Sequence, residues 1–424
     1  MNSGSSPSTL SPRRRNLTLG LIAVVGALNY IDRQIFGIFM PQIGKDLQIN
    51  HEQLGFIAGL SFSVFYLIAA FPIARLADRG DRPLIIALCV SVWSTATAAC
   101  ALAGSMLQLV LIRIGLAAGE GGAGPASQSL ILELYPKERR TLVLSVLLAS
   151  GAVGLGAGGA IGGWLSQWLD WRGSLVAVGL PGLLVGLAVW LFAAEPRRAG
   201  GAAFQAPPRV PLREVFVTIA GSTSLRWTAA TVICISTAGF PFLIWAGSFY
   251  QTVHAMSPRE AGAALFIPIT GGLVVGNLLA GWLGDRFSRG RPRYYAMFAA
   301  LGLMAAFPFG IAMAQAESPG ASLAFFFAYN AFLTLHLAPM QALAFAQVPV
   351  NQRAMLGATL TMVITLAGVG VGTWLVGGLS TFFAERFGDQ SLRYAMTAVC
   401  FSIPLGAAFA LMAGRTAKPF EENA

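Results

Sequence analysis

The stretch Ala74-Arg75-Leu76-Ala77-Asp78-Arg79-Gly80-Asp81-Arg82 separates two long apolar runs, and a diverged copy of it occurs later in the chain. The copy is Gly281-Trp282-Leu283-Gly284-Asp285-Arg286-Phe287-Ser288-Arg289, whose Leu-Gly-Asp-Arg core lies 207 residues after Leu-Ala-Asp-Arg. Each copy places an Asp-Arg pair in a short basic connection between apolar segments, as is typical of the cytoplasmic side of a membrane protein. The pair of copies indicates a duplicated chain whose two halves cross a membrane.

The remainder of the chain supports the duplication at a similar spacing. Gly154 recurs 214 residues later as Gly368, and Pro125 recurs at the same spacing as Pro339. Glycine matches alone would carry little weight in a chain with 49 glycines, but the proline match is independent of them. Small residues let membrane helices approach closely. We therefore expect a helix-packing role for Gly154, Gly158, Gly162, Gly163, Gly368 and Gly372.

The composition predicts the fold class. Of the 424 residues, 55% are hydrophobic and 11% are charged, whereas soluble domains carry about 25% charged residues. Apolar runs of about 20 residues, the length that crosses a bilayer, occur twelve times. The chain is thus predicted to be an all-α membrane protein with twelve transmembrane helices in two six-helix bundles.

Basic residues predict the orientation of the helices. Of the 28 lysines and arginines, 21 fall in connections on one side and five on the other. Because such an excess marks the cytoplasmic side, both termini are predicted to be cytoplasmic, and the net charge of +10 implies no nucleic-acid partner. The predicted parts are an N-terminal tail (1–16), a first bundle (17–194), a cytoplasmic linker (195–222), a second bundle (223–414) and a C-terminal tail (415–424).

Several classes of site are not expected. Cys89, Cys100, Cys234 and Cys400 lie singly within apolar runs, without the spacing of a disulfide framework or a metal site. None of the three lysines has the context of a nucleotide-binding loop. Two G-x-G-x-x-G strings begin at residues 119 and 154, but they lie inside predicted membrane helices rather than after a strand. We predict no enzymatic activity, no metal and no cofactor, with protons as the coupling ion.

The motifs resemble a known superfamily. Residues 74–82 are similar to the loop signature G-x-L-a-D-R-x-G-R-K of the major facilitator superfamily, with Ala74 in place of glycine and Pro83 in place of the final lysine. The glycine run 154–163 is similar to the fifth-helix antiporter signature, with Gly159 where that pattern has proline. The resemblance covers nearly the whole chain and implies a transporter with two related six-helix bundles.

Two further motifs resemble the Spinster branch of that superfamily. They are Asn29-Tyr30-Ile31-Asp32-Arg33 and the run from Arg113 through Gly119-Glu120 to Pro125. Spinster-like proteins include proton-linked transporters of lysolipids and sphingolipid phosphates. Anion:cation symporters share a similar first-helix Asp-Arg and fourth-helix arginine, so a small organic anion is an alternative substrate.

Four charged residues, Asp32, Arg33, Arg113 and Glu120, lie within the apolar runs of the first half. A charge at the centre of a bilayer costs about 2.5–3.5 kcal/mol on insertion scales, so it needs a partner or a wet cavity. Arg113 and Glu120 are two helical turns apart on one face, and Arg33 and Glu120 lie at similar depths, roughly 18–24 Å from the cytoplasmic end. We predict a cluster with Glu120 between the two arginines and Asp32 beside it.

This cluster is assigned to proton coupling, because a proton on Glu120 would be linked to the equilibrium between inward and outward states. The alternative is a permanently ionised network that only holds helices together. The Asp-Arg connections are assigned to a conformational latch, the alternative being exposed pairs of under about 1 kcal/mol. The latch residues are Asp78, Arg79, Arg82, Asp285, Arg286 and Arg289.

The second half lacks such buried charges and offers aromatic and neutral polar residues instead. An apolar wall with a few polar groups suits an amphipathic molecule whose anionic head pairs with arginine. The predicted substrate-binding residues are Tyr30, Arg33, Arg113, Glu120, Trp245, Tyr250, Asn330, His336 and Gln341. For the aromatics the alternative is packing against lipid or helices, and for His336 a structural hydrogen bond.

The sequence therefore favours a proton-coupled secondary transporter that moves an amphipathic organic anion, such as a lysophospholipid or a sphingolipid-like molecule, by alternating access. The alternatives are a symporter of a small carboxylate or sugar acid and a non-transporting membrane sensor, because fold alone does not establish function. We expect a multi-pass protein of the cell membrane (the inner membrane in a Gram-negative bacterium). Membrane lipids and the small substrate are its expected partners, and a monomer its expected functional state.

Overall fold

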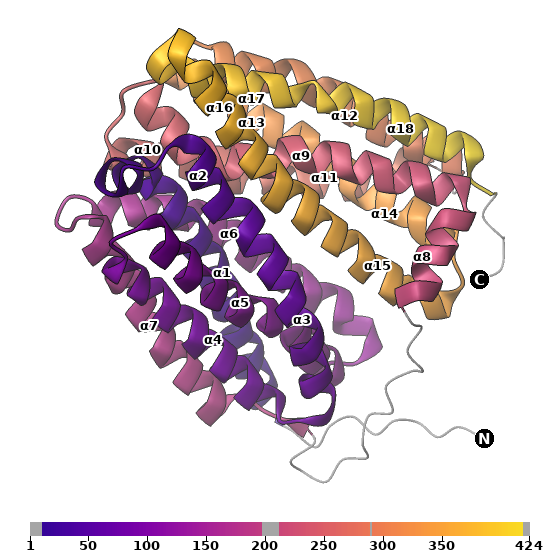
Figure 1. The fold of residues 1–424 in the computed structure, drawn as a ribbon. Helices are drawn as coiled ribbons and strands as arrows, with labels where there is room; N and C mark the ends of the chain where they lie inside the picture. Colours follow the sequence, from indigo (N-terminus) through magenta and orange to yellow (C-terminus); the bar gives the residue numbers. More distant parts are fainter. Residues whose placement is uncertain (1–10, 197–211, 289–290, 419–424) are drawn as a thin grey trace, which may run out of the picture. The chain divides into compact units, whose positions relative to one another are not determined.

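The computed structural model describes residues 11–196, 212–288 and 291–418, and the regular structure of this part of the chain is helical throughout, without strands (Figure 1). Eleven stretches of it are long and apolar enough to cross a membrane. They are Pro12–Leu47, His51–Arg79, Arg82–Leu102, Met106–Leu134, Leu142–Leu165, Trp171–Phe192, Thr223–Thr252, Pro258–Gly284, Pro292–Gln315, Pro319–Ala346 and Met355–Thr416.

The last of these stretches contains a chain reversal. It is 62 residues long, about 93 Å at 1.5 Å per residue, whereas the hydrocarbon core of a bilayer is about 30 Å thick. The chain turns at Gly388, whose φ of 53° lies in the left-handed region that glycine adopts without strain. The helices before and after this turn pack against each other.

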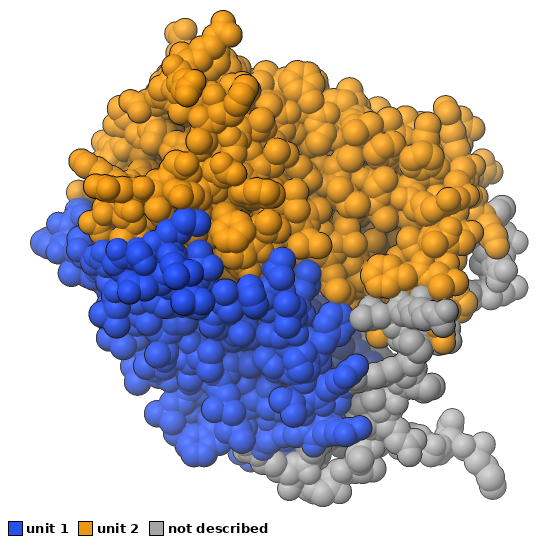
Figure 2. All heavy atoms as spheres, in the orientation of Figure 1, with its two compact units in different colours: residues 1–36, 64–158, 165–206 blue, residues 37–63, 159–164, 207–424 orange. Residues whose placement is uncertain are grey.

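The chain divides into two compact units, coloured separately in Figure 2. Unit 1 comprises residues 1–36, 64–158 and 165–206, and unit 2 comprises residues 37–63, 159–164 and 207–424. These units do not follow the repeat boundary of the sequence, because two segments of the first half make their contacts with the second half. The predicted bundles 17–194 and 223–414 describe the repeat, whereas the units describe the packing.

Unit 1 is built from the long helices of the first half. Three of them begin at a side-chain cap, because Asp81, Ser105 and Asp170 accept hydrogen bonds from backbone N–H groups of the first turn. The elements that contribute to it are α1 (Pro12–Leu47), α3 (Ser61–Arg79), α4 (Arg82–Ala99), η2 (Cys100–Leu102), α5 (Met106–Leu134), η3 (Lys137–Arg139), α6 (Arg140–Leu165) and α7 (Trp171–Phe192).

Unit 2 contains residues 37–47 of α1, 61–63 of α3 and 159–164 of α6, together with elements that lie wholly within it. They are α2 (His51–Gly55), η1 (Phe56–Leu60), α8 (Leu212–Gly221), α9 (Thr223–Thr252), α10 (Pro258–Phe266), η5 (Ile267–Gly271), α11 (Gly272–Ser288), α12 (Pro292–Gln315), α13 (Pro319–Leu333), η6 (Thr334–His336), α14 (Leu337–Ala346), α15 (Val350–Ile364), η7 (Thr365–Gly372), α16 (Thr373–Phe387), η8 (Gly388–Gln390), α17 (Ser391–Cys400) and α18 (Ser402–Thr416).

The predicted linker 195–222 contains structure at both of its ends, while 197–211 lies outside the described residues. Glu195 is buried in unit 1. Helix α8 occupies most of the other end and is amphipathic, with Val215 packed into a small apolar cluster that includes Leu225 and Leu356. Because Val215 is buried while its neighbours Phe216 and Val217 are exposed, α8 lies against unit 2 along one face.

Glycines bring helix backbones together in unit 1. A Cβ added at Gly154 would lie 2.3 Å from the carbonyl oxygen of Ala27, and one added at Gly158 would lie 2.8 Å from that of Ile31. Both distances are too short for a side chain. The fifth-helix glycines of α6 thus allow close contact with α1 at the level of the buried charges.

The corresponding glycines of unit 2 also contact backbone. An added Cβ would lie 2.9 Å from a carbonyl oxygen of α9 at both Gly368 and Gly372, and 2.6 Å from Pro258 at Gly163. Gly162 is buried. The repeat is not conformationally equivalent, however: the first glycine run lies in the α-helix α6, whereas the second lies in η7, a π-helical segment of eight residues.

Two other π-helical segments, η1 and η5, interrupt the second and eighth predicted spans. Segments η1 and η7 pack on each other inside unit 2, where a Cβ at Gly59 would lie 2.7 Å from the carbonyl oxygen of Gly370. Pro268 lies in η5, and its carbonyl accepts a hydrogen bond at 3.3 Å from the side-chain amide of Asn330 on α13. This bond gives the carbonyl a partner in the wider π-helical turn.

Candidate functional site

The sequence around Glu120 explains how a carboxylate becomes fully buried in a helix bundle. A Cβ at Gly121 would lie 2.4 Å from the carbonyl oxygen of Tyr66 on α3, and one at Gly119 would lie 2.8 Å from the backbone nitrogen of Trp93 on α4. The two glycines therefore bring α5 into backbone contact with both neighbours. Glu120 between them is 1% exposed, and its charge must be balanced inside the protein.

Arg33 supplies that balance. Its Nε donates to Oε2 of Glu120 at 2.9 Å, and its NH2 nitrogen lies 2.8 Å from the same oxygen. The Arg33 guanidinium also lies over two aromatic rings, 5.5 Å from the centroid of Tyr30 and 5.3 Å from that of Tyr66. The negative faces of these rings attract the cation, so Arg33 is held by one carboxylate and two tyrosines.

Asp32 and Arg113 complete the cluster predicted from the sequence. Both are nearly fully buried, at 5% and 4% exposed. The Arg113 guanidinium lies 3.9 Å from the ring centroid of Phe36 and interacts electrostatically with Asp32 and Glu120. Thr97 lies beside the Asp32 carboxyl. The structure thus brings the four charges together, but Glu120 pairs with Arg33 while Arg113 stacks on an aromatic ring.

The arrangement has a specific chemical capacity. Two carboxylates and two guanidiniums balance in charge, and removing one member of a buried pair costs about 3–5 kcal/mol because the other charge is left without compensation. Protonation of Glu120 differs from removal of a partner. It would free the Arg33 guanidinium from its ion pair, and it would leave no unpaired carboxylate behind. The cluster can therefore exchange a carboxylate partner for another anion while total charge stays balanced.

A second ionic cluster of unit 1 is centred on Arg82, which is completely buried. Its Nε donates to Glu195 at 2.9 Å, NH2 also donates to Glu195, and NH1 donates to Glu133 at 2.6 Å and to the Ser129 carbonyl at 3.2 Å. Arg82 lies in the first turn of α4 next to Pro83, a residue that suits that position because its missing N–H would be unpaired there.

The remaining predicted latch residues differ in environment. Asp78 is half-buried, whereas Arg79 and Arg286 are exposed. The side chain of Asp285 and the whole of Arg289 lie outside the described residues. Arg82 thus lies in a specific buried ion-pair network.

The predicted binding residues of unit 2 are mostly engaged inside the unit. Trp245 is fully buried and its indole N–H donates to the Thr373 carbonyl at 3.0 Å. The Tyr250 hydroxyl lies 2.9 Å from Ser322 Oγ, and Asn330 donates to two backbone carbonyls. His336 is buried and bonds the Leu333 carbonyl, while Gln341 is exposed. These contacts favour the packing alternative for the aromatics and leave Gln341 accessible.

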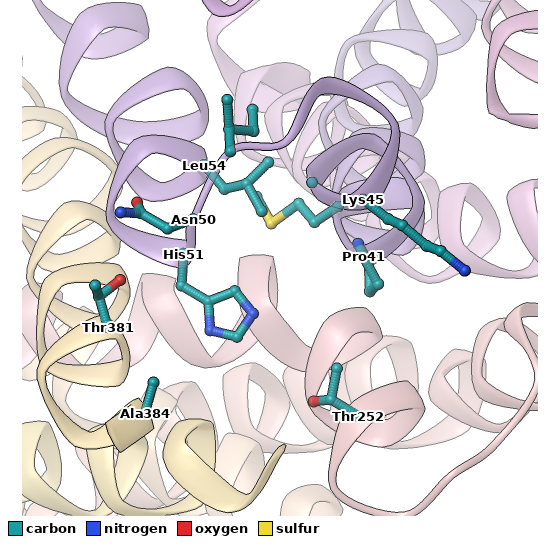
Figure 3. Close-up of a pocket in the computed structure, with 11 residues that line it drawn as sticks. Pro41, Lys45, Asn50, His51, Leu54, Thr252, Thr381 and Ala384 are labelled. Carbon is teal, nitrogen blue, oxygen red and sulfur yellow. The ribbon is translucent and has the colours of Figure 1, made fainter. Parts of the chain in front are cut away.

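A cavity of about 400 Å³ lies in unit 2 where α1 ends and α2 begins. Figure 3 shows His51 projecting into it, with Lys45, Thr252 and Thr381 along its walls. The His51 Nδ1 lies 2.8 Å from Ser380 Oγ, which in turn lies 2.9 Å from Ser391 Oγ. None of the residues predicted to bind substrate lines this cavity.

Several residues of these sites were not found from the sequence. Tyr66 has no charge and looks like an ordinary aromatic of an apolar run. Glu195 occurs in a Pro- and Arg-rich stretch that is typical of a solvated linker, and Glu133 occurs near the end of its run. The scarcity of acidic residues could have pointed to the two glutamates. Only 18 acidic residues occur in the chain, and one that lies within the membrane needs a partner.

The fold and these two ionic clusters define a polytopic helical membrane protein with ion pairs inside its first unit, an arrangement associated with transport pathways. Residues 22–372 match the sequence profile of the Major Facilitator Superfamily. The chain belongs to this superfamily of transporters, and it is an integral multi-pass membrane protein that resembles the Spinster branch.

Known proteins of several kinds are similar to the chain. An "MFS-type efflux pump" of Mycolicibacterium smegmatis is 29% identical over 393 residues, which cover 91% of this chain and 89% of that protein. A "Hexuronate transporter" of Bacillus subtilis is 26% identical over 63% of this chain and 64% of its own length. The crystal structure of a bacterial homolog to the human lysosomal transporter Spinster, in an inward-facing and unoccupied conformation, is 25% identical and covers 98% of this chain and 100% of its own, with a TM-score of 0.85.

Proposed function

We propose that this superfamily member is a proton-coupled secondary active transporter that moves an amphipathic organic anion by alternating access. The observation that carries the proposal is the Arg33–Glu120 ion pair, buried in unit 1 beside Asp32 and Arg113. Intramembrane ionisable groups are costly, and they mark proton relays and substrate pathways in membrane proteins. No cofactor other than the proton is part of the proposal.

The proposed coupling step is an exchange of partners on Arg33. When Glu120 is ionised it occupies the guanidinium, and when it binds a proton the guanidinium becomes available to the carboxylate or phosphate of the substrate. Arg113 supplies a second positive charge in the same cluster. Protonation and anion binding would then favour the same state, and that linkage couples the two gradients.

The amphipathic substrate class is supported by the likeness to Spinster homologues over nearly the whole chain. The similarity to a hexuronate transporter supports the second candidate, a symporter of a small carboxylate or sugar acid. Both classes present an anionic group to arginine. A non-transporting sensor on the same fold is the third candidate and would require no proton movement.

The membrane arrangement belongs to the same proposal. Because the stretch Met355–Thr416 reverses at Gly388, it supports two crossings and twelve in total, with both termini in the cytoplasm as the basic residues predict. We place the protein in the cell membrane as a monomer, surrounded by lipid. The Arg82 network is assigned the latch role together with its loop partners.

The test is uptake into proteoliposomes under an imposed pH gradient. Two probes separate the substrate classes: radiolabelled lysophosphatidylglycerol and radiolabelled glucuronate. We expect one of them to accumulate with wild-type protein when the compartment of origin is acidic, and Glu120→Gln to lose the gradient dependence. Glu52→Gln, which neutralises an exposed carboxylate on α2, is the control and should behave as wild type. Undiminished gradient dependence of a folded Glu120→Gln protein would exclude Glu120 as the coupling group.

A further inference from the structure

A groove of about 450 Å³ runs between α12 and α18 in unit 2. Its apolar wall includes Met297, Leu301, Met304 and Leu411, which are 40–62% exposed. These helices lie in membrane-spanning stretches, so the exposed side chains face lipid rather than water. The groove is comparable in volume to ligand sites, which measure about 300–1,000 Å³.

One end of the groove is strongly basic. Arg293, in the first turn of α12, and Arg415, in the last turn of α18, both line it. Gly414 brings these two helix ends together, because an added Cβ there would lie 2.3 Å from the Cβ of Ala296. No acidic residue lines the groove, and none of the ion pairs between described residues involves either arginine. Among the described residues, two exposed guanidiniums thus share one site without a carboxylate.

The length of the groove matches one leaflet of a bilayer. From Arg293 to Met304 on α12, and from Pro404 to Arg415 on α18, the walls extend eleven residues, about 16 Å at 1.5 Å per residue. Half of a hydrocarbon core is about 15 Å. If the apolar end of the groove reaches the bilayer midplane, its basic end lies at the level of the lipid headgroups. The basic residues of the sequence predict that this end faces the cytoplasmic leaflet.

We propose that the α12–α18 groove is a binding site for an anionic phospholipid, whose phosphate group pairs with Arg293 and Arg415 while an acyl chain lies along the apolar wall. Guanidinium groups bind phosphate in a bidentate manner, and basic pockets between membrane helices on the cytoplasmic side bind anionic headgroups. This lipid is a resident of the surface of unit 2. It is separate from the transported substrate, and the site does not depend on the proposed function.

Native mass spectrometry of the purified full-length protein tests the site. The protein is titrated with palmitoyl-oleoyl phosphatidylglycerol and, separately, with palmitoyl-oleoyl phosphatidylcholine, which has the same acyl chains but no net charge. We expect wild-type protein to retain the anionic lipid preferentially. In Arg293→Gln/Arg415→Gln this preference should fall by about 25-fold, because each arginine near a membrane surface contributes about five-fold.

Two further variants make the test specific. Arg226→Gln/Arg286→Gln removes two exposed arginines of unit 2 that do not line the groove, and it should keep the wild-type preference. Ala408→Trp fills the exposed groove wall without changing charge, and it should lower retention of both lipids.

Three results would overturn the proposal. They are equal retention of the two lipids by wild-type protein, an equal loss of preference in both arginine pairs, and a protein dimer that Ala408→Trp dissociates while lipid retention stays unchanged. The first would remove the headgroup contact and the second would show a general surface attraction. The third would assign the groove to a second copy of the chain.

Discussion

The two units differ in what they bury. The charged side chains that the described part of the chain buries, Asp32, Arg82, Arg113, Glu120 and Glu195, all lie in unit 1, and Arg33 pairs with one of them. The buried polar residues that the structure describes in unit 2 are neutral: serines, threonines, Asn330 and His336. Duplication of the helices and glycines was therefore not accompanied by duplication of the charges.

This difference separates two ways of holding helices together in a membrane. In unit 1, ion pairs fix particular side chains opposite one another, and a single neutralisation leaves a charge without a partner. In unit 2, neutral hydrogen bonds and close glycine contacts hold the helices together, and each contact adds little to stability by itself. Substitutions should therefore have larger effects in unit 1 than in unit 2.

The largest effect is expected at Arg82. Arg82→Gln would leave Glu195 and Glu133 without their shared cation, and removing one partner of such a buried network costs about 3–5 kcal/mol. The measurement is thermal unfolding in detergent, where the midpoint should fall strongly. Arg79→Gln, an exposed arginine three residues earlier, is the matched control. Equal midpoints for the two variants would contradict the ionic account of unit 1.

A smaller loss is expected where α5 touches α3. Gly121→Ala would place a methyl group 2.4 Å from the Tyr66 carbonyl oxygen, and such overpacking costs about 1–3 kcal/mol. It would also displace Glu120 from Arg33, so gradient-driven uptake should fall as well as the unfolding midpoint. Gly124→Ala on the same helix meets nothing within 4 Å and should be neutral or slightly stabilising. If both alanines behave alike, close backbone approach does not position Glu120.

In unit 2 the corresponding effect should be modest. Ser380→Ala removes the hydroxyl that lies between His51 and Ser391, and the loss of a neutral hydrogen bond typically costs about 1 kcal/mol. Thr361→Ala, which removes only a bond from an exposed threonine to its own helix, is the control and should change stability by less than about 0.5 kcal/mol. A loss at Ser380 as large as that at Arg82 would remove the distinction between the units.

The smallest effect concerns pH and His254, which lies in the connection between α9 and α10 and stacks on Tyr250. Burial lowers the pKa of His254, and Arg393 lowers it further. The unfolded chain thus binds a proton at this residue more readily than the folded protein does. Stability should therefore fall as the pH drops below the ordinary histidine value of about 6.5.

The check is the unfolding midpoint of His254→Gln and of wild type between pH 8 and pH 5. The variant should lose less stability on acidification, since its side chain cannot take up the proton. Midpoint curves that stay parallel over this range would show that His254 is not a source of the acid sensitivity.

Much of the architecture was available from the sequence because it depends on local and repeated features. Apolar runs of membrane length predicted the helical stretches, and the Asp-Arg copies with the glycine offset predicted the duplication. The four intramembrane charges could be placed together because their depths follow from helical rise and because each needs a partner. The pairing of Glu120 with Arg33 was within reach of this reasoning.

The rest depends on information that a single sequence does not carry. Glu195 and Arg82 are 113 residues apart, and a glutamate beside prolines and arginines looks the same whether it is solvated or buried. The glycine runs of α6 and η7 are alike in composition, yet one is α-helical and the other π-helical, a difference that composition does not specify. Tyr66 contributes its aromatic ring to the site because α3 places that ring beside Arg33, and nothing in the sequence around Tyr66 indicates this placement.

The composition of unit 2 has a consequence for biosynthesis. His51 of α2 rests against Ser380, and 329 residues separate them in the chain. At about 5–20 residues per second, a ribosome needs roughly 15–65 s to make the second after the first. Helix α2 therefore enters the bilayer before the ribosome has made α16, the helix on which it packs in the folded protein. During that interval Gly55 and His51 lack their contacts with α16, and a truncated chain that ends before α16 would never acquire them.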